Sequence, residues 1–249
     1  AEATLRALVP GDLPGEPTPL PPPEWEQLDR PLSTVLRRRQ SSFGRFRRPP
    51  ELTLAQVGTT LAFAASARHH PSDVKLPDGA PTLTRLWLFA NHVDGLPAGT
   101  YAYLPAGDEA SAPSDRADDA STAPRRHALV PVRPAPPEGM TAFLQRQYFL
   151  TNYTMSQVGA VLAISGRLDA ILDAYGPAGY RVLNAEVGTV AQYAYCAAAA
   201  QGIGCGAVLG FDNVAMNEAL GLTSTDERTV LFVLLGREHD RPADWAYQL

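Results

Sequence analysis

The feature that most constrains the fold of this chain is a glycine-rich segment that follows a helix instead of preceding one. Residues 180–201 have the composition of a long apolar helix, and the sequence GIGCG at residues 202–206 leads from it into a strand. A dinucleotide-binding fingerprint needs the strand first and the helix second, with its glycines at the turn between them. The sequence therefore predicts a helix that feeds a glycine-rich strand, and it argues against a Rossmann fold.

The end of this glycine-rich strand is the first candidate for a ligand contact. Four residues lie there, just before the helix-capping type Asp212: Ala207, Val208, Leu209 and Gly210. A strand that ends before a capped helix leaves main-chain amides free, and glycine allows a ligand to approach the backbone closely. We expect these amides to hydrogen-bond a planar cofactor.

The length allows one large domain or two small ones over residues 31–249, preceded by a proline-rich arm or linker at residues 1–30. Apolar periodicity predicts helices over residues 31–39, 52–67, 140–149, 168–176 and 180–201, and from Asp212 onward. Alternation predicts a hairpin over residues 83–104 and strands over 127–132, 156–165 and 229–236. Residues 105–126 are small and polar, which indicates a flexible insertion.

Charge and composition exclude several classes of protein. The formal net charge of -5 argues against nucleic-acid binding through phosphate neutralisation. No apolar run is long enough to span a membrane, and Cys196 and Cys205 lack the spacing of a metal site or a disulfide framework. We expect a cytoplasmic protein with two reduced thiols, no metal, and neither nucleic acid nor membrane as a partner.

The predicted helix over residues 180–201 also bears on assembly. Its residues are apolar or small on nearly every face, including Val187, Val190 and the alanines at 197–200. A helix that is apolar all round must be covered on all sides. A two-fold dimer with this helix near its centre would cover it, and so would the core of a monomer.

A second candidate site is a cluster of arginines and serines near the amino end. The segment RRRQSSFGRFRR places six arginines around Ser41 and Ser42, at the predicted end of the first helix. Guanidinium groups and hydroxyls at this density suit a phosphate monoester, because bidentate N–H donors match its oxygens. A solvated, arginine-rich helix end explains the composition equally well. A patch for RNA or membrane is weakened by the short run and the net negative charge.

Together these segments resemble the flavin-dependent nitroreductase superfamily, and most closely its azoline dehydrogenases, which oxidise thiazolines and oxazolines in modified peptides. The resemblance runs from about Pro31 to Arg237, and it rests on the Arg-x-Ser order at Arg39–Ser41, a Glu-x-Gly…Gln stretch at Glu186–Gln192, and the sequences GFDNVAMNEALGL and LLGRE. It implies an α+β, nitroreductase-like fold, with a central and mostly antiparallel sheet flanked by helices. It also implies a long central helix at a homodimer interface.

The resemblance implies FMN as the cofactor and assigns residues to it. The family holds the FMN phosphate with the arginine and serine of an Arg-x-Ser motif near the amino end. Here Arg39, Gln40 and Ser41 match that motif, and the resemblance assigns them and the preceding Arg38 to the cofactor. The backbone of Ala207, Val208, Leu209 and Gly210 corresponds to the segment that faces the isoalloxazine and donates to its N5. Arg237 corresponds to a late basic residue that reaches the phosphate.

Two positions depart from the azoline dehydrogenase pattern. In HPSDVKLPDGAPTLT, Ser72 or Asp78 replaces the usual serine, and the usual tyrosine is missing. The family's Lys-Tyr-Gly reads Ala174-Tyr175-Gly176, so the lysine proposed for proton transfer is absent. Tyr175 is then the candidate acid or base, provided that a neighbour lowers its pKa from about 10. Simple packing at a helix end explains Tyr175 as well.

The function implied by the resemblance is oxidation of peptide-borne azolines to azoles by an FMN-dependent dehydrogenase or oxidase. Its partners would be a modified peptide substrate and a cyclodehydratase or another biosynthetic enzyme. One alternative is an NAD(P)H-dependent reductase of nitro, quinone or enone compounds, which NAD(P)H alone would bleach. The other is a noncatalytic scaffold subunit with a vestigial flavin pocket, which would lack flavin absorption.

Overall fold

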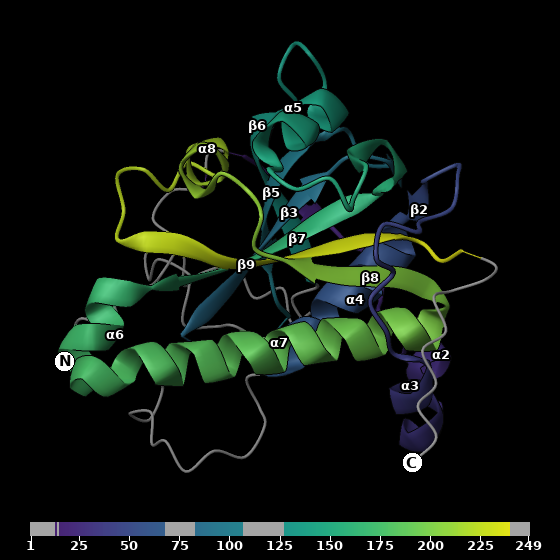
Figure 1. The fold of residues 1–249 in the computed structure, drawn as a ribbon, viewed down its shortest axis with the longest axis horizontal. Coiled ribbons are helices and arrows are strands. Elements are labelled where there is room, and N and C mark those ends of the chain that lie inside the picture. Colours follow the sequence, from purple (N-terminus) through teal and green to yellow (C-terminus); the bar gives the residue numbers. More distant parts are fainter. Residues whose placement is uncertain (1–12, 14, 68–82, 107–126, 240–249) are drawn as a thin grey trace, which may run out of the picture.

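A seven-stranded sheet forms the framework of the computed structural model, which describes residues 13, 15–67, 83–106 and 127–239 (Figure 1). The strands are ordered β1-β6-β5-β3-β7-β9-β8, and every neighbouring pair is antiparallel. Their bounds are β1 Thr18–Pro19, β3 Thr84–Ala90, β5 Gly99–Leu104, β6 Ala128–Pro134, β7 Ala160–Arg167, β8 Ile203–Val208 and β9 Glu227–Arg237. The predicted α+β fold with a mostly antiparallel central sheet is confirmed.

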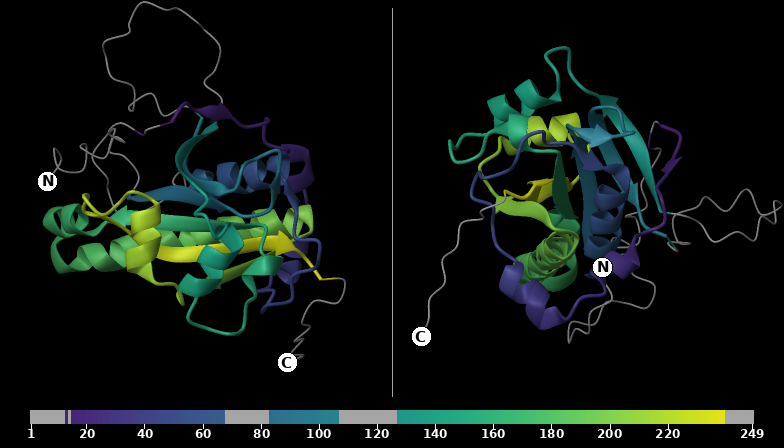
Figure 2. Two further views of the ribbon diagram at one scale, coloured as in Figure 1. Left: turned by 90° about the horizontal axis from the view of Figure 1, so that it is seen from above. Right: turned by 90° about the vertical axis from the view of Figure 1, so that its right-hand side faces the viewer.

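Helices cover both faces of this sheet (Figures 1 and 2). On one face lie α4 (Leu54–Ser66), α6 (Leu168–Tyr175) and α7 (Gly179–Gln201), and on the other lie α5 (Met140–Gln147) and α8 (Asn213–Ala219). Neighbouring residues of a strand point to opposite faces, so Leu88 joins the core under α4 and α7 while Phe89 joins the core under α5. Burial on both faces explains why β3, β7 and β9 are almost continuously apolar.

Local signals in the sequence correctly located several element boundaries. Thr53 caps α4 in a reciprocal capping box with Gln56, and the Asp212 side chain accepts hydrogen bonds from the amides of Val214 and Ala215 at the start of α8. The predicted hairpin is the antiparallel pair β3–β5, with β4 (Val93–Asp94) between its strands in the chain. β4 instead pairs in parallel with β2 (Leu52–Thr53) as a small second sheet. Most of the predicted insertion, residues 107–126, lies outside the described residues.

The proline-rich segment before Pro31 contributes to the domain from β1 onward. β1 pairs with β6, and Leu20 is 2% exposed and belongs to the core. The imidazole Nε2 of His127 lies 2.7 Å from the carbonyl oxygen of Pro21, and α2 (Trp25–Leu28) packs on α4. Prolines do keep this segment extended, as expected, but an extended chain can pair at the edge of a sheet. Residues 18–28 therefore form part of the folded domain, not a free arm.

Helix α7 is the longest element and runs across one face of the sheet (Figure 1). Its inner side, including Leu183, Val190 and Ala194, is buried, whereas Ala185 and Gly188 on its outer side are exposed. Within one chain the helix is thus not covered all round, because the sheet and α4 reach only part of its circumference. Within the described part of the chain, none of the helices combines the length and the hydropathy needed to cross a bilayer.

Candidate functional site

The arginine-serine segment and the glycine-rich strand meet at the hydroxyl of Tyr195 on α7. Ser41 Oγ lies 2.7 Å from Tyr195 Oη, and the amide of Ala207 donates to the same Oη at 2.7 Å. The guanidinium carbon of Arg39 lies 5.4 Å from the centre of the Tyr195 ring. Two segments that were singled out for different parts of one ligand therefore share a single contact residue.

The loop that follows α3 (Leu32–Arg38) is fastened along the outer edge of β8. The Ser42 amide donates to the Cys205 carbonyl at 2.8 Å, and the Cys205 amide donates to Ser42 Oγ at 3.2 Å. β8 is the last strand of the sheet, so these backbone groups have no neighbouring strand to pair with. Ser42 is buried and lies 3.3 Å from a carboxylate oxygen of Glu238. The loop thus carries Arg39 and Ser41 to a fixed place beside β8.

The glycines of the GIGCG segment serve this packing. Gly202 ends α7 in the left-handed conformation, with a φ of 70°, and its amide donates to the carbonyls of Ala198 and Ala199. A Cβ on Gly204 would lie 2.8 Å from Ser42 Oγ, and a Cβ on Gly206 would lie 2.2 Å from Tyr153 Oη. The motif lets a helix turn into a strand and lets side chains lie directly on that strand, in keeping with the argument against a Rossmann turn.

A free amide lies at the end of β8. The amides of Cys205 and Ala207 point away from β9, and the two-residue period of a strand places the Leu209 amide on the same edge. Among the residues that the structure describes, it has no hydrogen-bond partner. Leu209 and Phe149 are 72% and 69% exposed, and the Phe149 amide donates to the Gly210 carbonyl at 2.8 Å. An unpaired donor beside exposed apolar side chains fits a flat aromatic ring that carries an acceptor, such as a flavin.

The other residues predicted to bind the cofactor lie around this cluster or outside the described chain. Gln40 is half-buried between Arg39 and Ser41. Arg38, at the end of α3, is exposed. Together with Arg30 it lines a surface hollow that lies beside the carboxyl end of α7. The Arg237 guanidinium donates to the Pro49 carbonyl at 3.4 Å, and Val208 is buried. Ser72 lies outside the described residues.

Tyr175 does not join this cluster within one chain. It ends α6, and its hydroxyl is buried near the carboxylate of Glu186, with no hydrogen-bond partner in the described part of the chain. Glu186 accepts hydrogen bonds from the amide and hydroxyl of Thr84, at 2.9 Å and 2.6 Å. The nine residues from Glu186 to Tyr195 correspond to about 14 Å along the helix. Burial and the Glu186 charge raise the pKa of Tyr175, so the lowering that would favour a role as a base is not provided within the chain.

Burial also sets the ionisation of the groups around β8. It raises the pKa of the Tyr195 phenol, which stays protonated at neutral pH, and it raises the pKa of the Glu238 carboxyl. Cys196 and Cys205 are both free, and burial raises the pKa of each thiol. A thiol with a raised pKa forms little thiolate, so neither cysteine is suited to act as a nucleophile.

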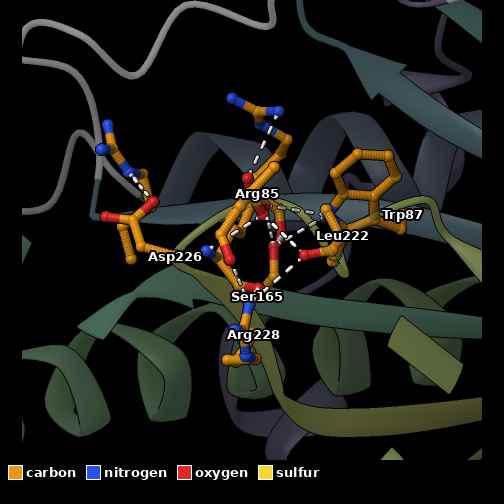
Figure 3. A network of polar contacts seen from close by, with 9 residues as sticks. Arg85, Trp87, Ser165, Leu222, Asp226 and Arg228 are labelled. Carbon is orange, nitrogen blue, oxygen red and sulfur yellow. Dashed lines mark hydrogen bonds and ion pairs between the residues drawn. The ribbon is translucent and has the colours of Figure 1, made fainter. Parts of the chain in front are cut away.

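A second polar cluster lies at the opposite end of β9 (Figure 3). The indole nitrogen of Trp87 donates to Ser165 Oγ at 2.7 Å and to the Glu227 carboxylate at 3.1 Å, and Arg85 lies 3.5 Å from the other Glu227 oxygen. Arg167 pairs with Asp226 beside it. The buried Glu227 carboxylate thus has both hydrogen bonds and a counter-charge, as a structural ion pair requires. From Glu227 to Arg237 is about 33 Å along the strand, so this cluster is separate from the candidate site.

Two residues of the site were not singled out in the sequence. Tyr195 reads as one more aromatic residue in an apolar helix, and Glu238 reads as a neighbour of the predicted Arg237. One available signal is that a helix turning at Gly202 into a strand must run alongside that strand. A tyrosine in the last turns of the helix then lies beside the first residues of the strand, where its hydroxyl can satisfy an edge amide.

Comparison with known proteins agrees with this fold. A family model described as the nitroreductase family matches residues 36–237. No curated protein matches the sequence significantly.

Solved structures provide a comparison of the fold. A structure assigned to a nitroreductase of Anabaena variabilis superposes with a TM-score of 0.62 at 22% identity and covers 84% of this chain, which spans only 38% of that one. A chain of the E. coli microcin synthetase McbBCD complex with truncated pro-MccB17 bound superposes with a TM-score of 0.59 at 17% identity. The match covers 96% of this chain and 82% of that one. A structure assigned to a nitroreductase of Exiguobacterium sibiricum, in complex with FMN, superposes with a TM-score of 0.51 at 13% identity. The match covers 88% of this chain and 93% of that one.

Proposed function

The chain belongs to the nitroreductase family, and on that premise we propose that it is an FMN-dependent oxidoreductase that oxidises peptide-borne azolines to azoles. The observation that carries the flavin part of this proposal is the meeting of Ser41 and Ala207 at the Tyr195 hydroxyl. This contact supports the proposal that the phosphate-binding residues and the end of β8, whose Leu209 amide has no partner among the described residues, belong to one site.

The residues present fit FMN by the chemistry of their donors. Arg39 and Ser41 supply a charged and a neutral donor for the phosphate, which accepts hydrogen bonds only. The free Leu209 amide supplies a donor for the ring, and the exposed side chains of Leu209, Phe149 and Leu150 supply apolar surface that a flat ring would bury. Arg237 lies on β9 directly beside Ile203 of β8, so it can turn from Pro49 toward a phosphate at this edge.

FMN, when bound, would supply the acceptor for a hydride and pass the electron pair on to an external acceptor such as dioxygen. The chain itself would bind and orient FMN and the substrate, and it would exclude water from them. Aromatising an azoline also requires the loss of a proton from the ring carbon next to the carbonyl. The raised pKa of Tyr175 keeps its phenol protonated, so this residue suits donation of a hydrogen bond to the substrate better than removal of the proton.

Two observations support a modified peptide as the substrate. The sequence resembles azoline dehydrogenases over most of the domain, and the fold is similar to that of a chain in a complex that holds a bound pro-peptide. By the same analogy, a cyclodehydratase that forms the azoline is the partner we expect.

We also infer a homodimer formed through α7. Its outer face presents the small residues Ala185 and Gly188, which allow a second helix to approach closely. A two-fold axis perpendicular to α7 would pair this helix with an antiparallel copy of itself. The amino half of α7 in the second copy, with Glu186 and Tyr175, would then lie toward the carboxyl half of this one, which carries Tyr195. Such a pairing would bring Tyr175 toward the candidate site, which one chain does not do.

The cofactor part of the proposal is tested by the flavin content of the purified protein and its Arg39→Ala variant. The protein should show the absorption bands of bound flavin and release FMN on denaturation. Arg39→Ala should remain folded and lose most of the FMN, because a charge-assisted contact to the phosphate is removed. Arg37→Ala removes an exposed arginine in the last turn of α3, two residues before Arg39; it is the matched control and should keep FMN. Equal flavin in wild type and Arg39→Ala would contradict the assignment of the phosphate site.

The substrate part is tested with a thiazoline-containing peptide under air. Mass spectrometry should show the loss of two hydrogens per ring, together with the gain of thiazole absorption. Rapid bleaching of the flavin by NAD(P)H, with no change in the peptide, would favour the alternative reductase. A protein that stays colourless after incubation with FMN would leave the scaffold alternative.

A further inference from the structure

We propose that Tyr195 sets the hydrogen-bond direction of the phosphate grip: its hydroxyl accepts from the Ala207 amide and donates to Ser41, so that the Ser41 proton points outward to an anion. This inference rests on the proposed function, since it takes the anion to be the phosphate of FMN. Tyr195 then acts as a positioning residue for the cofactor and contributes to the choice of FMN over riboflavin.

The first step fixes the role of the Tyr195 oxygen toward β8. A backbone amide can only donate, and the Ala207 nitrogen lies 2.7 Å from Tyr195 Oη. The phenol oxygen is therefore the acceptor in this contact. Its single proton must go to another group.

The second step fixes where that proton goes. Ser41 Oγ, 2.7 Å away, is the acceptor within hydrogen-bond distance of Tyr195 Oη in the described part of the chain. If Ser41 instead donated to Tyr195, the buried phenol proton would have no acceptor, and an unsatisfied buried donor is costly. Burial raises the pKa of the Tyr195 phenol, so this proton stays in place at neutral pH.

The third step concerns the ligand. Because Ser41 Oγ accepts from Tyr195, its own proton is directed away from Tyr195. Ser41 is half-buried, so this proton is accessible to a ligand, and the Arg39 guanidinium lies over the Tyr195 ring beside it. A group that only accepts hydrogen bonds and carries negative charge, such as a phosphate monoester, matches this arrangement. The terminal hydroxyl of riboflavin brings no negative charge and gains much less from the contact.

The experiment compares the affinities of the flavin-free protein for FMN and for riboflavin. Tyr195→Phe should weaken FMN binding at least tenfold, the scale of a hydrogen bond to a charged group, and should change riboflavin binding by no more than about twofold. Ser41→Ala should have the same effect, and the double variant should lose little more, because both changes break one chain of hydrogen bonds. Tyr193→Phe, whose ring is stacked on Phe63 at 5.1 Å, is the matched control and should bind both flavins normally.

The outcomes separate this inference from the proposed function. Unchanged FMN affinity in Tyr195→Phe, or an equal loss of FMN and riboflavin, would overturn it. If Tyr195→Phe does not fold by circular dichroism, Ser41→Ala decides, with Ser41→Thr as the variant that should restore FMN binding. If wild type binds neither flavin, the proposed function fails. Inorganic phosphate then tests the inference by itself, because it should raise the melting temperature of wild type and not that of Ser41→Ala. If phosphate has the same effect on both proteins, the inference is overturned as well.

Discussion

At the scale of single residues, the hydroxyl groups of Ser42 and Tyr195 do for β8 what a neighbouring strand would do. They occupy the outward amides of Cys205 and Ala207, and an edge strand with such groups unpaired would invite pairing with another chain. The next amide on that edge, Leu209, has no partner among the described residues. The residues that close the edge thus leave this amide at the end of β8 for a ligand.

Burial of the Glu238 carboxyl predicts that the stability of the protein depends on pH. Its folded pKa is raised above 4.5 by burial, so the stability that the protonated carboxyl contributes is complete below pH 4.5 and is lost as the pH rises through the raised pKa. Glu238→Gln removes this titration. Urea unfolding of the flavin-free protein at a series of pH values should show that the variant gains on wild type in free energy of unfolding as the pH rises.

The control for this test is Glu218→Gln, which removes an exposed carboxyl on α8. It controls for the change in net charge that every Glu→Gln substitution brings. A Glu238→Gln profile parallel to that of wild type across the whole range would show that folding does not raise the pKa of Glu238.

At the scale of elements, β1 shows how an extended, proline-rich segment becomes part of a core. It pairs with β6, and His127 holds the next residues through the Leu20 amide, which donates to the His127 carbonyl at 3.0 Å, and through the Pro21 carbonyl. The side chain of Leu20 lies in the core beneath α4, where it touches the position of Gly58. The segment closes the β6 edge of the sheet much as the Ser42 loop closes the β8 edge.

This role predicts that Leu20→Ala is costly. Truncation of a buried leucine should lower the free energy of unfolding by roughly 2–4 kcal/mol, through lost burial and the cavity that remains. Leu32→Ala, at a position that is 66% exposed, should lower it by less than about 0.5 kcal/mol. Chemical denaturation of both variants measures the difference. Equal stabilities would mean that residues before Pro31 behave as a linker in solution.

At the scale of the whole molecule, the outer face of α7 is the part that one chain leaves uncovered. A Cβ placed on Gly188 meets nothing within 4 Å, and Ala185 beside it is exposed. Near the amino end of the same helix, the buried hydroxyl of Tyr175 has no hydrogen-bond partner among the residues that the structure describes. A second copy paired through α7 would cover this face and bring the two ends of α7 together.

Gly188→Trp tests this pairing. The single chain has room for the indole, so the variant should fold, but a second helix in contact at this position would be displaced. Sedimentation should show wild type as a dimer and Gly188→Trp as a monomer, with wild-type circular dichroism. Glu218→Trp, at an exposed site on α8, is the control and should remain a dimer. A Gly188→Trp dimer would show that α7 does not form the interface.

The sequence by itself determined most of the elements after Pro31, and their order. Capping at Thr53 and Asp212, the two-residue and 3.6-residue periods, and the helix-then-glycine order are local properties that adjacent residues fix. It also indicated both segments of the candidate site. Only the tertiary structure decided that they meet, that Tyr195 joins them, that Leu20 is buried and that Tyr175 lies apart within one chain. These contacts join residues far apart in sequence. Their geometry depends on how the helices pack on the seven-stranded sheet, which no local sequence pattern predicts.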